Sequence, residues 1–246
     1  MQISERVRLV GSGELGFQTS HSLDCNVFLL DGGAEHALID AGSGVEPERI
    51  VANVERAGVP TDRVKRLLLT HAHGDHAAGA RFFRDRLGVE VTCPEEAAPW
   101  LEQGDLEKTS LRLAKEAGVY PEDFRYDPCP VASPVADDDT ITVGDLELRV
   151  LETPGHSRGH VSYLWTEDGL SSLFGGDTVF AGGKILIQNI WDCSLQDYAG
   201  TVRKLDGLRL DRLYPGHGPF LLSEAHRHVR RANAQFEDLG VPPNIQ

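Results

Sequence analysis

Short apolar runs alternate with amphipathic segments along the chain, and glycine or proline separates most of them. The runs at 26–33 and 36–44 flank a glycine-containing turn, which predicts a hairpin. The segment 47–58 has proline near its start and glycine at its end, as helices commonly do. The apolar run at 64–70 predicts a buried strand, and a second helix and a short strand are expected after it.

A similar order of elements recurs beyond residue 139. Turns at Gly144-Asp145 and Asp168-Gly169 predict two more hairpins. A helix over 195–208, a strand that ends near Pro215 and an amphipathic helix over 223–240 are expected to follow. Two halves of this kind predict an α/β protein with two sheets packed face to face and helices outside them. We expect one domain over residues 1–246, with a helical and loop insertion at about 95–139 that interrupts the strand-rich chain.

The formal net charge of −14 argues against a nucleic-acid partner and against binding to an anionic membrane. No apolar run approaches the ~18 residues that span a membrane, and the N-terminal residues lack the apolar region of a signal peptide. The four cysteines are widely spaced without a CxxC motif, so no disulfide framework is expected. These features predict a cytoplasmic protein that acts on a small molecule, and they leave its oligomeric state open.

The predicted strand at 64–70 runs directly into a cluster of His71, His73, Asp75 and His76. A loop can turn successive side chains toward one point, whereas a strand points them to alternate faces. Imidazole and carboxylate groups are suitable ligands for zinc, iron or manganese. On its own the cluster also fits a polar loop that begins a helix.

Three later residues, His156, Asp177 and His217, change this balance. Each follows an apolar strand and lies next to glycine, which allows close approach of the backbone. Ligand-type side chains at four separate strand ends are hard to explain by packing, and they predict a metal centre.

This set, an HxHxDH motif followed by histidine, aspartate and histidine, resembles the metallo-β-lactamase-fold metallohydrolases over nearly the whole chain. The resemblance implies an αββα sandwich of two mixed β-sheets flanked by helices. It implies two divalent metal ions per chain, most often zinc, with iron or manganese as alternatives. It assigns the first ion to His71, His73 and His156, the second to Asp75, His76 and His217, and a bridging role to Asp177.

A hydroxide that bridges two divalent ions is a nucleophile near neutral pH. The expected activity is therefore dinuclear metal-dependent hydrolysis of a carboxylic ester, a thioester or a lactone, with Asp75 as the catalytic residue that orients the hydroxide. Two alternatives stay open: a mononuclear iron oxygenase of the persulfide-dioxygenase kind, and a non-catalytic metal-binding member.

Comparison within the superfamily narrows the activity but not the substrate. Redox di-iron members usually carry glutamate where this chain has His73. Glyoxalase-II-like hydrolases share the ligands, but their glycine- and cysteine-rich stretch after the bridging aspartate is absent here. Lactonase-like members usually have a tyrosine shortly after that aspartate, where this chain has Phe180.

Residues outside the ligand set are expected to have supporting roles. The insertion at 95–139 separates two ligand-bearing loops, so we predict that it covers the substrate as a lid, through residues such as Trp100 and Phe124. His160 is expected to form hydrogen bonds or pack rather than bind metal, and ordinary packing is favoured for Tyr163 and Tyr198.

Overall fold

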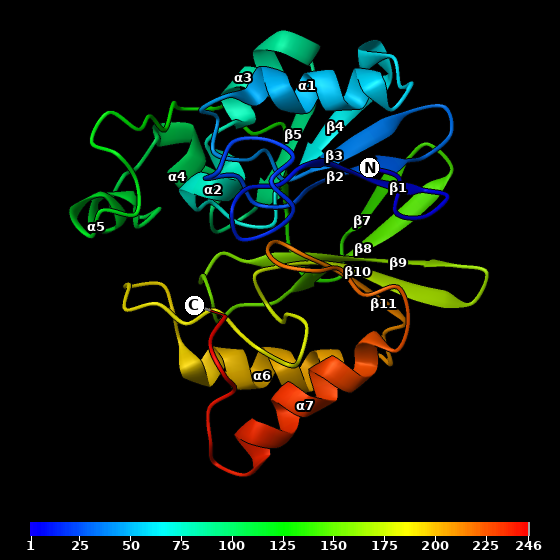
Figure 1. Ribbon diagram of the computed structural model, residues 1–246. Coiled ribbons are helices and arrows are strands. Elements are labelled where there is room, and N and C mark those ends of the chain that lie inside the picture. The colour runs from blue at the N-terminus through cyan, green and yellow to red at the C-terminus, as the bar shows by residue number, and fades with distance from the viewer. Residues whose placement is uncertain (246) are drawn as a thin grey trace. The chain divides into compact units, whose positions relative to one another are not determined.

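The computed structural model describes residues 1–245. The chain folds into two compact units, and each contains one mixed β-sheet with helices on it (Figure 1). Unit 1 comprises residues 1–135 and 142–147, and unit 2 comprises 136–141 and the residues from 148 onward. The prediction of two mixed sheets flanked by helices is confirmed. The expectation of a single domain with an insertion stays a prediction.

The sheet of unit 1 has six strands in the order β1-β2-β3-β4-β5-β6. The first three strands pair antiparallel, and β3 to β6 pair parallel. Parallel neighbours end at the same edge of a sheet, so the loops that follow β3, β4 and β5 leave from one edge. The strands are β1 (Val7–Gly11), β2 (Val27–Asp31), β3 (His36–Ile39), β4 (Val64–Leu68), β5 (Glu90–Pro94) and β6 (Ser133–Val135).

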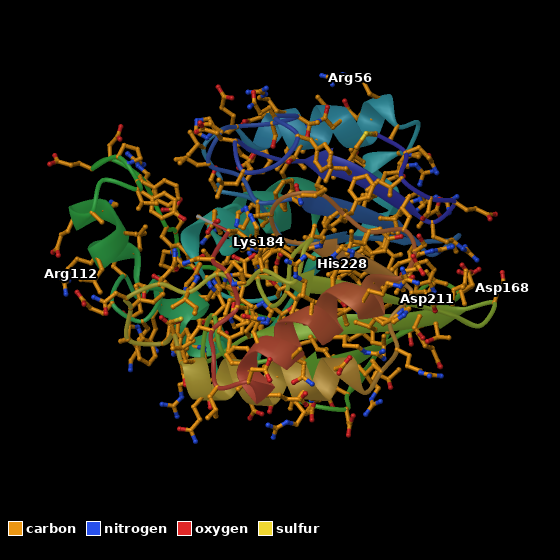
Figure 2. The ribbon with its side chains drawn as sticks, turned by 60° about the horizontal axis from the view of Figure 1, so that its bottom comes forward. Arg56, Arg112, Asp168, Lys184, Asp211 and His228 are labelled. Atoms are coloured by element: carbon orange, nitrogen blue, oxygen red, sulfur yellow. The ribbon has the colours of Figure 1, made fainter. Side chains whose placement is uncertain are left out.

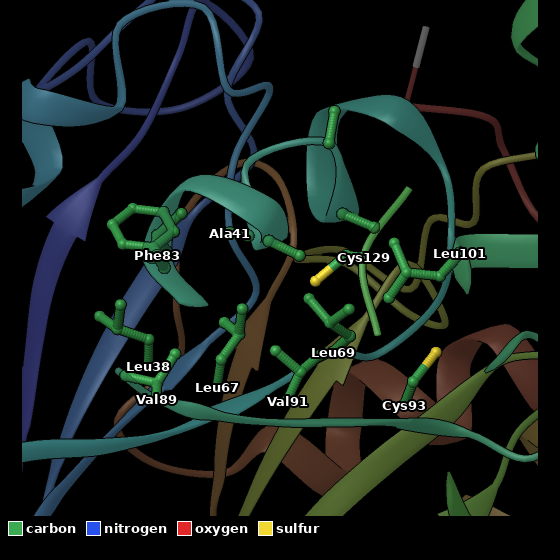
Figure 3. Packing of buried hydrophobic residues seen from close by; sticks show 14 of the residues in the cluster. Leu38, Ala41, Leu67, Leu69, Phe83, Val89, Val91, Cys93, Leu101 and Cys129 are labelled. Carbon is green, nitrogen blue, oxygen red and sulfur yellow. The ribbon is translucent and has the colours of Figure 1, made fainter. Parts of the chain in front are cut away.

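Helices α1 (Pro47–Arg56) and α3 (Ala80–Leu87) cover one face of this sheet (Figure 1). Ile50 of α1 and Phe83 of α3 are fully buried in the same apolar cluster as Leu67 of β4, and Figure 3 shows Phe83 beside the strands. Burial of each such side chain stabilises the fold by about 1.5–3 kcal/mol. The remaining short helices of this part are η1 (Thr61–Arg63) and α2 (Gly74–Ala77).

The insertion at 95–139 contributes to the core of unit 1. It contains α4 (Ala98–Gln103) and α5 (Leu111–Glu116), and Gly104 ends α4 in a left-handed conformation. Its large apolar side chains lie in the same cluster as the sheet. The stretch expected to be loop also supplies β6, which pairs with β5, so that part of the expectation is wrong. Figure 2 shows Arg112 on the outer side of α5, where it forms ion pairs with Glu107 and Glu116.

The second sheet, most of which belongs to unit 2, has five strands in the order β11-β10-β9-β8-β7, with β10 and β11 parallel and β8 to β10 antiparallel. Asp168 and Gly169 both have positive φ, as a type I′ turn requires, and Figure 2 shows Asp168 at the tip of this predicted hairpin. The strands are β7 (Thr140–Val143), β8 (Leu146–Glu152), β9 (Val161–Glu167), β10 (Leu170–Gly176) and β11 (Arg212–Pro215).

Two helices, α6 (Leu195–Asp206) and α7 (Ala225–Glu237), lie side by side in unit 2 (Figure 1). Val202 of α6 and Val229 of α7 are buried together with Leu173 and Leu213 of the sheet, so the helices cover one of its faces. Among the described residues, no helix combines the length and apolar character needed to cross a membrane. All four cysteines are free, as predicted.

Candidate metal centre

The loop after β4 brings three predicted ligands together. His71 and His76 are fully buried and His73 is nearly so. The ring of His71 lies 4.6 Å from that of His73 and 4.1 Å from that of His76, between centroids. The chain enters α2 directly after His73, with the N–H groups of His76 and Ala77 donating to the His73 carbonyl. This helical turn returns His76 to the side of His71.

Asp40, at the end of β3, orients two of these imidazoles. It is 2 % exposed and has a φ of 63°, a left-handed conformation that aspartate tolerates. Its carboxylate accepts hydrogen bonds from the Thr70 backbone and hydroxyl and lies 2.8 Å from Nδ1 of His76. Since Asp40 is an acceptor, Nδ1 of His76 carries the proton and Nε2 keeps its lone pair for a metal.

The same carboxylate orients His71 through Thr70. The Thr70 hydroxyl donates its single proton to Asp40, so it accepts at its 3.0 Å contact with Nδ1 of His71. This fixes the proton of His71 on Nδ1 and leaves Nε2 as the ligand atom. Sequence reasoning did not identify Asp40 or Thr70, although both lie at the ends of adjacent parallel strands.

Asp75, the fourth predicted ligand of this loop, contacts the insertion. The hydroxyl of Tyr120 donates to Oδ1 of Asp75 at 3.0 Å, and Oδ2 lies 3.7 Å from Nε2 of His76. Burial, followed by the nearby Asp75 charge, raises the pKa of Tyr120 well above its ordinary value, so this hydroxyl stays protonated. A second tyrosine of the insertion, Tyr126, donates to the carbonyl of Ala72 at 2.8 Å. The insertion therefore lies directly beside the histidine loop, while its role as a lid stays a prediction.

Cys25 also lies near this loop. Its thiol, a carboxylate oxygen of Asp40 and a ring nitrogen of His76 are within 4.8 Å of one another, which is close enough to hold a metal ion. Burial raises the pKa of Cys25 to about 12. The Cys25 side chain is fully buried in the apolar cluster of unit 1, so packing is the role we assign to it.

The three predicted ligands of the second half lie together in unit 2. Nε2 of His156 and Nε2 of His217 each lie 3.4 Å from the same atom, Oδ2 of Asp177. These separations exceed the usual N–H···O hydrogen-bond range. They agree with the spacing of roughly 3.3–3.4 Å between ligand atoms that each lie about 2.0–2.1 Å from a tetrahedral ion. All three side chains are buried, and the distance of each histidine from Asp177 is the one expected when both residues bind the same divalent ion.

Backbone groups and supporting side chains hold this trio. Nδ1 of His156 lies 2.9 Å from the carbonyl of Leu186 and donates to it, so Nε2 faces Asp177. The N–H of Asp177 donates to Nε2 of His160, whose Nδ1 contacts the Thr153 hydroxyl, which confirms the hydrogen-bonding role predicted for His160.

Both tyrosines for which packing was predicted are fully buried in unit 2. The hydroxyl of Tyr198 donates to the carbonyls of Asp177 and Leu186, and Tyr163 lies within β9. Packing is confirmed for both. Neither the Leu186 carbonyl nor the link through Tyr198 has a recognisable sequence signal.

The chain resembles known proteins in sequence and in fold. A family model described as the metallo-beta-lactamase superfamily matches residues 22–217. The chain is 29% identical over 196 residues to a beta-lactamase-like protein 2 homolog of Caenorhabditis elegans, covering 80% of this chain and 56% of that protein. It is 29% identical to acyl-coenzyme A thioesterase MBLAC2 of Homo sapiens, covering 88% of this chain and 80% of that protein.

A hydroxyacylglutathione hydrolase of Rhodopseudomonas palustris (strain HaA2) is 30% identical over 56% of this chain and 42% of that protein. The chain thus spans about half the length of the worm and bacterial relatives. Among solved structures, a metallo-beta-lactamase family protein from Thermus thermophilus has a TM-score of 0.72 and 25% identity, covering 94% of this chain and 79% of that one. This likeness confirms the predicted fold class.

Proposed function

Because this chain belongs to the metallo-beta-lactamase superfamily, we propose that it is a dinuclear metal-dependent hydrolase that cleaves a thioester bond. The human relative is called an acyl-coenzyme A thioesterase, and this chain covers a larger share of it than of the worm and bacterial relatives. That name favours the thioester among the three bonds expected from the sequence, which were the carboxylic ester, the thioester and the lactone.

The observation that carries this proposal is the approach of His156 and His217 to one oxygen of Asp177, both at 3.4 Å. These equal distances support Asp177 as the residue that two bound ions would share. We propose that the predicted ligands hold two ions, with zinc as the first candidate and iron or manganese as alternatives. The first ion is assigned to His71, His73 and His156, the second to Asp75, His76 and His217, and both to Asp177.

Bound divalent ions supply a water nucleophile near neutral pH and polarise the carbonyl of the substrate. The residues of the chain orient the reacting water and exclude other water from the metal site. Asp75 is the most exposed member of the histidine loop, since its side chain is 21% exposed whereas that of His76 is fully buried. Its carboxylate is therefore the group of this loop to which we assign the orientation of the attacking hydroxide. The buried histidines keep other water away from the ligand atoms.

Metal analysis and a substrate panel test the proposal together. Purified protein should contain about two equivalents of zinc, iron or manganese. It should hydrolyse an acyl-coenzyme A or an acylglutathione with a kcat/KM at least about tenfold above that for an aryl ester or a lactone. Chelation should abolish this activity, and the removed ion should restore it. About one equivalent of iron with uptake of oxygen would identify the mononuclear oxygenase instead, and a full metal content without turnover would identify a non-catalytic member.

A further inference from the structure

Tyr120, which belongs to the insertion, donates its hydroxyl group to the predicted ligand Asp75. Tyr120 donates to Oδ1 at 3.0 Å, while Oδ2 is the oxygen that lies 3.7 Å from Nε2 of His76. The two oxygens of a carboxylate are chemically equivalent until a neighbour distinguishes them. Here the hydroxyl binds one of them and leaves the other on the side of the His76 ligand atom.

Packing holds this hydroxyl in place. The ring of Tyr120 lies 4.4 Å from that of Phe124, between centroids, and both residues are buried. A Cβ atom at Gly74 would lie 3.2 Å from carbon atoms of both rings, so the glycine allows them to rest against the first residue of α2. The position of the hydroxyl therefore depends on the ring pair and on the glycine that precedes Asp75.

We propose that Tyr120 is a positioning residue that presents only Oδ2 of Asp75 to the metal. The proposal rests on the assignment of Asp75 as a ligand in the proposed function. With Oδ1 held by the phenol, Asp75 binds through one oxygen and cannot rotate to place both oxygens on an ion. Residues that contact the ligands of a metal commonly change metal affinity or activity by about 10–100-fold when they are replaced.

Tyr120→Phe tests this inference, because it removes the hydroxyl and keeps the ring. Tyr126→Phe is the matched control: Tyr126 belongs to the same insertion, is also buried, and donates to the Ala72 backbone rather than to a ligand. Zinc affinity is measured by competition with a chromophoric chelator, the absorption spectrum is recorded after cobalt substitution, and the Tm of the metal-free protein is determined for both variants.

Tyr120→Phe should weaken binding of the second zinc equivalent by about 10–100-fold and change the cobalt spectrum. The first equivalent and the metal-free Tm should stay close to those of Tyr126→Phe, and kcat should fall more than KM changes. Phe124→Leu, which keeps the hydroxyl but loosens the ring pair, should shift zinc affinity in the same direction by less.

Equal zinc affinities and cobalt spectra for Tyr120→Phe and Tyr126→Phe would overturn the proposal, as would a loss of metal-free stability with unchanged zinc binding. These metal readouts do not require turnover. If the wild-type protein hydrolyses nothing on the panel while Tyr120→Phe still weakens the second zinc, the proposed function fails and the positioning role stands.

Discussion

The ligand sets of the two units are oriented by different kinds of groups. In unit 1, side chains do this work: Asp40 holds His76 directly and His71 through Thr70, and Tyr120 holds Asp75. In unit 2, a backbone carbonyl, that of Leu186, holds His156. Orientation by side chains can be altered by a single substitution that leaves the backbone unchanged. Orientation by a carbonyl depends on the path of the whole loop.

The loop around Leu186 is fixed by hydrogen bonds on both sides of that residue. The N–H of Ile185 donates to the carbonyl of Pro243, and the N–H of Ile245 donates back to the carbonyl of Ile185. The side chain of Asn244 donates to the carbonyl of Ile187 at 2.8 Å. Backbone hydrogen bonds and the Asn244 side chain thus hold the carbonyl that orients His156. We therefore expect the orientation of His156 to resist single substitutions outside the ligand set better than the ligands of unit 1 do.

Replacement of a ligand itself should give the largest effect, even in unit 2. Asp177→Asn keeps the shape of the side chain but places a neutral amide oxygen where two histidines approach one carboxylate oxygen. A neutral oxygen is a poor bridge between two cations. We expect kcat/KM to fall by at least about 100-fold, the upper end of the loss seen for groups that merely support a ligand. Metal content should fall below two equivalents, and the metal-free protein should remain folded.

Asp192→Asn is the control for this loss. Asp192 is another buried carboxylate of unit 2, and it accepts from the Ser157 hydroxyl at 2.7 Å. Steady-state kinetics and metal analysis on both folded variants decide the role of Asp177. Activity of Asp177→Asn within a few-fold of wild type would rule out the bridge and leave Asp177 as a turn residue.

In unit 1, Asp40→Asn should reduce metal binding although Asp40 is not a ligand. Asparagine tolerates the positive φ of this position, and its oxygen can still accept from the Thr70 backbone. Its NH₂ group would then face Nδ1 of His76 and donate to it. The proton of His76 would move to Nε2, the atom needed by the metal, so affinity should fall by about 10–100-fold.

Asp24→Asn is the matched control in unit 1, because Asp24 is also buried and accepts from the hydroxyls of Ser20 and Ser43 and from the His21 backbone rather than from a histidine ring. Chelator competition compares the two variants. If Asp40→Asn binds zinc as tightly as Asp24→Asn does, the carboxylate does not set the protonation of His76, and the contrast between the units is lost.

Some features of the metal centre and the fold leave a local signal in the sequence and could therefore be predicted. Ligands at strand ends leave local signals, because His71 and His76 belong to one short motif and Asp177 follows two glycines. The sheets and most helices were likewise predictable from apolar runs bounded by glycine and proline.

Other features have no local signal. β1 is a short strand interrupted by Arg8, and β6 contains a proline, so neither resembles a regular apolar run. The partner of Tyr120 lies 45 residues away along the chain, and a contact across that separation depends on tertiary packing. The carbonyl of Leu186 is a backbone atom that every residue carries, so no residue type marks it.

The smallest effect on zinc affinity should come from replacement of a tyrosine of unit 2. Tyr198 is fully buried, and its hydroxyl donates to the carbonyls of Asp177 and Leu186. Tyr198→Phe leaves buried carbonyls with fewer hydrogen bonds, at a cost of about 1–3 kcal/mol. For a chain of this size, Tm should fall by about 2–10 °C. The Leu186 carbonyl still accepts from His156, so zinc affinity should stay within about threefold of wild type, well short of the loss for a group that orients a ligand side chain.

Tyr198→Phe and Tyr120→Phe remove the same atom from a buried tyrosine near a ligand. We expect one variant to lose stability and the other to lose zinc affinity. The variant in unit 2 should lose stability and keep its metal, because the backbone path still places the Leu186 carbonyl against His156. The variant in unit 1 should keep its metal-free stability and bind its second zinc more weakly, because it loses the hydroxyl that distinguishes the two oxygens of Asp75. Thermal melts of the metal-free proteins measure the stability of both variants, and chelator competition measures their zinc affinity. If Tyr198→Phe released zinc as readily as Tyr120→Phe, the carbonyl would not suffice to orient His156, and side chains would govern the ligands in both units.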